Sequence, residues 1–149
     1  MNTYRISELQ TLLGSNLGSS EWVSVDQARI DQFAAVTGDH QWIHVDTERA
    51  AAGPFGTTVA HGFLTLSLVP VMVGMAFKVS EVRMSVNYGL NRARFTAPVP
   101  AGSRLRGHFK LVSLESIRGG TQVVVEATIE REGHSKPVCV AELVARHFI

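Results

Sequence analysis

The chain has very little cysteine and no excess of charge of one sign. Cys139 is the one cysteine among 149 residues, so no internal disulfide can form, which fits a reducing compartment. Lys and Arg number 14 and Asp and Glu 13, which gives a formal net charge of +1. This balance argues against nucleic acid or an anionic membrane as the main partner.

Long apolar runs and targeting signals are also missing. The first 13 residues lack the basic start and apolar stretch of a signal peptide. The longest apolar stretch, Phe63 to Phe77, contains Pro70 and Gly74 and is shorter than the roughly 20 residues that a membrane span needs. We therefore expect a cytoplasmic protein that forms one domain over residues 1–149 and does not enter a membrane.

Helical patterns prevail in the first half of the chain. Ile6 and Leu9 have helical spacing, with Ser7 and Gln10 as a capping pair, and Gly14 to Ser20 is typical of a loop. A short strand is predicted at Trp22 to Val25. Asp26 is placed to cap a helix that ends at Gly38.

An ordered loop with short helical turns, one of them near Thr47 to Ala52, is expected over residues 39–58. The apolar segment Phe63 to Phe77 follows, and it predicts a central helix covered on most sides and kinked at Pro70.

The second half alternates apolar and polar residues, which is typical of strands. Examples are the alternation from Val82 to Tyr88 and the run from Val123 to Ile129, with a bulge expected in the last strand, which ends near Phe148. Short turns between the strands favour an antiparallel meander. The predicted fold class is α+β, with a long antiparallel sheet wrapped around one apolar helix.

Asp39 and His44 are the first candidates for chemistry. On a straight helix, five residues would turn their side chains about 140° apart, so they meet only if the chain turns between them. A carboxylate beside an imidazole can hold and polarise a water molecule. The alternative is that Asp39 caps a turn and His44 is a packed histidine, which for an arbitrary pair is the commoner case.

A metal site is a competing interpretation of the same segment. His40 and His44 would share one face of a helix, and His61, Asp39 or Asp46 could complete the ligand set. The pattern lacks the Glu of the zinc-binding His-Glu-x-x-His motif, so we predict no metal.

Several further residues have polar groups that a ligand could use. Gly62 stands near the start of the apolar helix, where free backbone N–H groups can stabilise an oxygen that gains negative charge. His61 is interpreted as a hydrogen-bonded structural histidine. Asn87 and Tyr88 interrupt the strand pattern near Gly89 and could line a substrate pocket, although a bulge or turn explains the interruption equally well. Arg94 belongs to a basic stretch that could contact phosphates, although such arginines more often form a solvated face.

These segments together resemble the MaoC-like (R)-specific enoyl-CoA hydratases, a family that is also similar to nodulation protein N. The resemblance is carried by residues 37–46 (TGDHQWIHVD), 53–56 (GPFG) and 60–64 (AHGFL), and by Asn87-Tyr88-Gly89, Arg94-Phe95 and Pro98-Val99 with Gly102. It covers about residues 20 to 148. One departure is Gln41-Trp42, where many members have Asn-Pro, so the loop conformation and acyl-chain preference can differ.

The resemblance implies a hot-dog fold, in which a curved antiparallel sheet wraps a long central helix, and a homodimer. It also implies that Asp39 and His44 hold the attacking water and that the Gly62 N–H polarises the thioester carbonyl. The expected reaction adds water to a trans-2-enoyl-CoA to give the (R)-3-hydroxyacyl-CoA, with no cofactor. A hot-dog acyl-CoA thioesterase and a non-catalytic acyl-CoA-binding protein are the alternatives, although residues 63–77 contain no Asp or Glu for hydrolysis.

Overall fold

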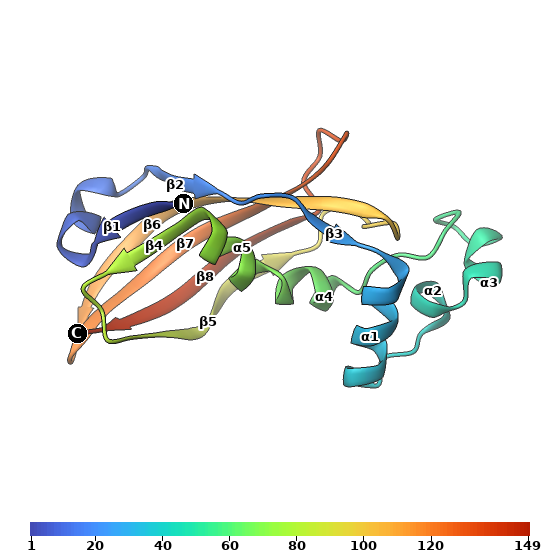
Figure 1. The fold of residues 1–149 in the computed structure, drawn as a ribbon, viewed down its shortest axis with the longest axis horizontal. Helices are drawn as coiled ribbons and strands as arrows, with labels where there is room; N and C mark the ends of the chain where they lie inside the picture. Colours follow the sequence, from blue (N-terminus) through green and yellow to red (C-terminus); the bar gives the residue numbers. More distant parts are fainter.

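The computed structural model describes all 149 residues and consists of a curved sheet with a run of helices along one face and beyond one end (Figure 1). The helices are α1 (Gln27–Thr37), α2 (Trp42–Val45), α3 (Thr47–Ala51), α4 (Gly62–Ser67) and α5 (Val69–Ala76), with a 3-10 helix at Ile6–Leu12. The strands are β1 (Asn2–Arg5), β2 (Asn16–Ser19), β3 (Val23–Val25), β4 (Phe77–Ser80), β5 (Met84–Arg94), β6 (Ser103–Ile117), β7 (Gly120–Arg131) and β8 (Cys139–Phe148).

The main sheet has the order β2-β6-β7-β8-β5, and β3 also pairs with β6. Strands β6, β7 and β8 form the predicted antiparallel meander. The prediction is wrong for β5, which pairs with β8 and not with β6, because residues 95–102 cross the end of the sheet. Backbone bonds from Thr96 to Val138 and from Ala60 to Val99 hold this crossing. A bulge near Gly89 is confirmed, because the register of β5 with β8 shifts between Asn87 and Gly89 and again between Leu90 and Arg92. The bulge expected in the last strand itself is not observed.

The central helix is interrupted, so the prediction of one helix from Phe63 to Phe77 is wrong in its continuity. α4 ends at Ser67, Leu68 is the junction, and α5 begins at Val69 with Pro70 in its first turn. Proline lacks an N–H and is tolerated only in the first turn of a helix, so a new helix starts there. Phe77 opens β4, which pairs in parallel with β1.

Two predictions near the N-terminus also need correction. Residues 16–19, predicted to be loop, form β2, and Gly18 (φ 147°) lets that strand approach α5. A Cβ on Gly18 would lie 2.7 Å from the Ala76 carbonyl oxygen. The first helix is 3-10, and its cap is the Glu8 carboxylate, which accepts from the Arg5 N–H at 2.8 Å, in place of the predicted Ser7 and Gln10 pair.

The predicted limits of α1 are confirmed. The Asp26 carboxylate accepts from the Arg29 N–H at 2.9 Å. At the other end, Gly38 adopts φ 80°, a left-handed conformation that glycine takes without strain, and its N–H donates to Ala34. The chain therefore turns sharply just before Asp39.

The main core lies between α5 and the sheet. Val69, Met72 and Ala76 of α5 are buried, as are Phe109 and Leu111 of β6. The opposite face of the helical run is open in the single chain, since Phe63 is 69% and Val71 47% exposed, so the helix is less covered than predicted. No helix is long and apolar enough to span a membrane.

Candidate active site

Asp39, His44 and His61 meet at the end of the molecule where the helices gather. A carboxylate oxygen of Asp39 and one ring nitrogen of each histidine all lie within 4.8 Å of one another. Asp39 follows the left-handed turn at Gly38, and His44 lies on the short helix α2. The chain thus turns between Asp39 and His44, as a shared site requires.

The buried ring of His44 is fixed by the backbone. Its Nδ1 lies 2.7 Å from the Val59 carbonyl oxygen, and the residue is only 7% exposed. A carbonyl oxygen can only accept, so Nδ1 carries the hydrogen of the bond. In the neutral ring, Nε2 therefore has a free lone pair that can accept a proton.

His61 supports both members of the pair. Its ring stacks on His44 with centroids 3.8 Å apart, and its Nε2 lies 2.9 Å from the backbone carbonyl oxygen of Asp39. By the same reasoning Nε2 is the donor, which leaves Nδ1 as an acceptor that is buried without a partner. The hydrogen-bonded structural role predicted for His61 is thus observed. Of the sequence interpretations, only the metal alternative had placed His61 beside Asp39 and His44. The Ala-His-Gly segment was the available signal.

A cavity of about 390 Å³ adjoins this cluster and is lined by His44, Gly62, Thr65, Phe95 and apolar residues. Asp39 is exposed and lies outside the lining. A Cβ on Gly62 would lie 2.7 Å from the Phe95 ring, so close packing provides a reason for glycine here. The hydroxyl of Thr65 is buried without a hydrogen-bond partner.

The other sequence candidates lie elsewhere. Asn87 lines a separate, larger cavity, and Tyr88 is 58% exposed with the Arg146 guanidinium 3.5 Å from its ring centre. Arg94 is exposed, and its guanidinium donates to the carbonyl of Ala93. The structure therefore does not bring these three residues to Asp39 and His44.

The structure also changes which residues could form a metal site. His40 is exposed and is not part of the cluster, whereas His61 is. Asp46 caps α3 by accepting from the Arg49 N–H. Two imidazoles and a carboxylate are donor types that zinc accepts, so the cluster has the composition of an incomplete metal site as well as of an acid-base pair.

Comparisons with known proteins agree on one family. A sequence model of the MaoC like domain matches residues 8–133. The chain is 50% identical to "3-hydroxyacyl-thioester dehydratase Z" of Mycobacterium tuberculosis over 99% of both chains. It is 46% identical to "Nodulation protein N" of Rhizobium leguminosarum, over 97% of this chain and 91% of that protein.

A solved structure shows the same fold. The unliganded R-hydratase PhaJ1 of Pseudomonas aeruginosa superimposes with a TM-score of 0.74 at 23% identity, over 91% of this chain and 81% of that one. The hot-dog fold expected from the sequence is confirmed.

Proposed function

The chain belongs to the MaoC-like domain family and is a hydro-lyase of the hydratase/dehydratase type, and from this premise we propose that it hydrates trans-2-enoyl-CoA to (R)-3-hydroxyacyl-CoA. The observation that carries the proposal is the approach of the Asp39 carboxylate and a His44 ring nitrogen to within 4.8 Å. One water molecule can hydrogen-bond to two groups at that separation. It would stand beside the cavity that His44 and Gly62 line.

The proton acceptor follows from the hydrogen bond of His44. Because Val59 engages Nδ1, Nε2 is the free acceptor that would take a proton from the water. As the water oxygen bonds to C3, Asp39 orients it. The pair then returns a proton to C2, and the same steps run backwards in dehydration. Coupled groups titrate together, so the division of roles between Asp39 and His44 belongs to the pair.

The thioester carbonyl gains negative charge while C3 is attacked. Gly62 opens α4, and its N–H has no acceptor within the helix, as is general for a first turn. We assign this N–H as the donor to the carbonyl oxygen, a type of interaction that typically contributes about 3 kcal/mol to the transition state. The helix has only six residues, so the local N–H and not a long helix dipole would act.

The mechanism uses no cofactor and no metal. Asp39 and His44 supply the acid and base groups, and the substrate brings the thioester. A chelator distinguishes this proposal from the metal alternative: dialysis against EDTA should leave the rate unchanged, whereas a metal held by His44 and His61 would be lost with activity.

We also propose that the enzyme is a cytoplasmic homodimer. β5 is the end strand of the main sheet, and its apolar side chains Met84, Val86, Tyr88 and Leu90 are between 37% and 58% exposed. A long apolar edge strand in a stable protein is usually covered, and an antiparallel pair of β5 strands related by a two-fold axis would cover it. Light scattering should give twice the chain mass, and Val86→Lys should shift it toward the monomer.

Turnover tests the proposed reaction directly. Purified protein mixed with crotonyl-CoA should remove the enoyl absorbance, and a coupled (R)-specific 3-hydroxyacyl-CoA dehydrogenase should oxidise the product while an (S)-specific one does not. Release of free thiol without loss of the enoyl absorbance would instead indicate a thioesterase. Tight binding without either change would indicate a binding protein.

A further inference from the structure

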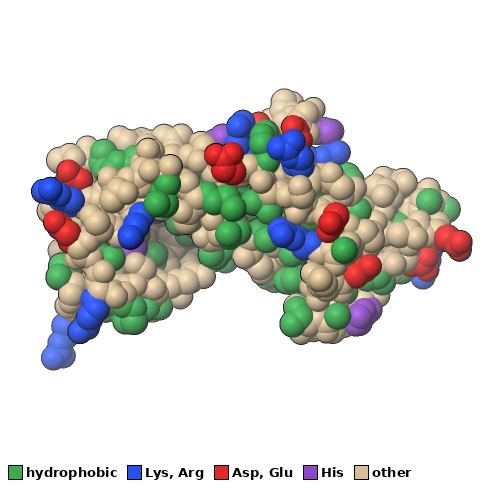
Figure 2. Space-filling model, in the orientation of Figure 1, with side chains coloured by type: hydrophobic (Ala, Val, Ile, Leu, Met, Phe, Trp, Pro, Cys, Tyr) green, Lys and Arg blue, Asp and Glu red, His purple; other side chains and the backbone are tan.

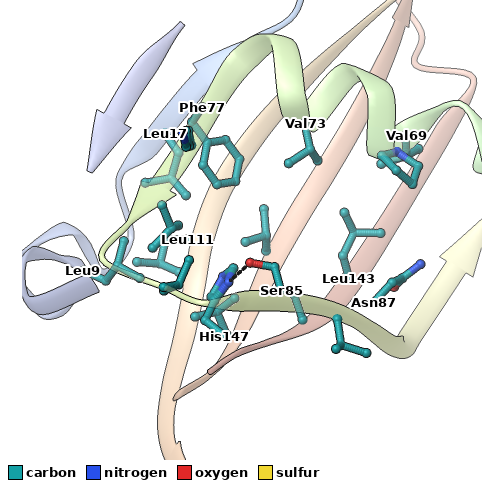
Figure 3. A pocket seen from close by; sticks show the side chains of 18 of the residues that line it. Leu9, Leu17, Val69, Val73, Phe77, Ser85, Asn87, Leu111, Leu143 and His147 are labelled. Atoms are coloured by element: carbon teal, nitrogen blue, oxygen red, sulfur yellow. Dashed lines mark hydrogen bonds between the residues drawn. The ribbon is translucent and has the colours of Figure 1, made fainter. Parts of the chain in front are cut away.

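A second cavity, of about 930 Å³, lies between α5 and the sheet and is separate from the cavity beside His44. Its lining is mainly apolar and includes Val69, Val73, Phe77, Leu111 and Leu143 (Figure 3). Figure 2 shows the surface hollowed in the left half of the view, which is the half that α5, β4 and β5 occupy in Figure 1. Its size is at the upper end of the range for cavities that take small molecules.

Polar residues interrupt this apolar wall, among them Lys78, Arg83 and Asn87, and two others form a hydrogen-bonded pair. His147 of β8 is 8% exposed, and its Nδ1 lies 2.7 Å from the hydroxyl oxygen of Ser85 on β5 (Figure 3). The other ring nitrogen, Nε2, has no hydrogen-bond partner in the protein although His147 lines the cavity. Nε2 is accessible to water, since the fully buried unpartnered side-chain atoms are His61 Nδ1 and Thr65 Oγ1. A ligand group that hydrogen-bonds to Nε2 would take the place of that water.

The charge state of the His147 ring limits which chemical groups of a ligand it can bind. Burial lowers the pKa of His147, so the ring is neutral at physiological pH. A neutral ring offers Nε2 either as a donor, when Ser85 donates to Nδ1, or as an acceptor, when Nδ1 donates to Ser85. A hydroxyl group can donate and accept, so it can hydrogen-bond to either form of the neutral ring. A ketone can only accept, so it pairs with one form, and a carboxylate binds more favourably to a charged ring.

We infer that this cavity binds an acyl chain that carries a hydroxyl group away from its thioester end, with the Ser85–His147 pair as the recognition point for that hydroxyl. The inference rests on the proposed function for the identity of the thioester. The two cavities follow one another along the helical run: Gly62 and Thr65 line the smaller one, and Leu66, Ser67 and α5 line the larger. A chain whose thioester lies near Gly62 would extend in the direction of His147.

Calorimetric binding of saturated acyl-CoAs tests the inference without requiring turnover. Dodecanoyl-CoA is compared with its monohydroxy derivatives, with the hydroxyl placed at each carbon of the distal half of the chain. For at least one position, the hydroxylated ligand should bind about tenfold more tightly than dodecanoyl-CoA, the effect of one well-placed hydrogen bond in an apolar wall. His147→Phe keeps an aromatic ring and removes both nitrogens, so the preference should disappear while dodecanoyl-CoA still binds.

His134→Phe is the matched control, since His134 is exposed and its ring bonds only to the Glu132 carbonyl, and it should keep the preference. Ser85→Ala serves as a second variant should His147→Phe fold poorly, and it should reduce the preference because the ring loses the partner that orients it. Equal affinity for all ligands in the wild type, or a preference that survives in His147→Phe, would overturn the inference. Hydration of crotonyl-CoA is measured separately: activity without the preference refutes this inference alone, and the preference without activity refutes the proposed function alone.

Discussion

Replacing His61 with Phe should separate the positioning of the acid-base pair from the stability of the fold. The Phe ring keeps the stacking position, where His61 lies 3.8 Å from the His44 ring centre and 4.9 Å from that of Phe33. It removes the Nε2–H that donates to the Asp39 carbonyl at 2.9 Å. Asp39 then loses the bond that fixes its backbone beside His44.

The expected effects of His61→Phe on stability and on turnover differ in size. Asp39 lies on an exposed stretch, so water can replace the lost donor, and the substitution also removes the buried, unpartnered Nδ1. The free energy of unfolding should therefore change by no more than about 1 kcal/mol. A carboxylate displaced by about 1 Å can reduce turnover by on the order of 100-fold, so we expect kcat to fall between about 10-fold and 100-fold.

Steady-state hydration of crotonyl-CoA and urea unfolding should be measured on the same preparations. KM should change little, because His61 lines neither cavity. His61→Gln, which keeps a donor group, should recover part of the lost kcat. A His61→Phe variant with unchanged kcat, or one whose loss of activity is explained by unfolding, would refute this role for His61.

Three further predictions follow from packing and burial. Gly62→Ala should lower kcat and stability together, because its Cβ would lie 2.7 Å from the Phe95 ring, and Phe95→Leu should recover stability in the double variant; stability unchanged in the single variant would contradict this. Burial lowers the pKa of His147 from its ordinary value of 6.5, so below about pH 6.5 the unfolded chain binds a proton that the folded chain does not, and the free energy of unfolding should fall as the pH drops. Urea unfolding at a series of pH values should show a smaller dependence of that free energy on pH for His147→Phe; the same dependence in both proteins would contradict this. Burial raises the pKa of the Cys139 thiol to about 11, so iodoacetamide should label it at neutral pH only after unfolding, and rapid labelling of the native protein would refute its burial.

Local patterns in the sequence were sufficient for much of the fold. The Asp26 cap and the glycine stop at Gly38 depend on neighbouring residues alone, and α1 has the predicted limits. The alternation of apolar residues likewise located β6, β7 and β8. Strand order was not accessible in the same way, because the pairing of β5 with β8 depends on the path of residues 95–102 over the end of the sheet.

The candidate site, too, was predictable only where it depends on local sequence. Asp39 and His44 could be selected from residue type and a turn at Gly38, and Gly62 from its place at the start of the apolar helix. The family resemblance assigned their roles. The stacking of His61 on His44 joins segments 17 residues apart and has no local pattern. The pairing of Ser85 with His147 spans 62 residues and arises from the strand register of β5 and β8, which places the two opposite each other.

The most direct test of the central claim compares three single variants in the hydration of crotonyl-CoA. Asp39→Asn and His44→Ala should each reduce kcat by about 100-fold or more, which is the usual contribution of a positioned acid or base. His40→Ala is the control, because His40 is exposed in the same segment and outside the cluster, and it should retain wild-type kcat. If Asp39→Asn or His44→Ala folds and retains wild-type kcat, the pair does not carry the reaction and the account is wrong.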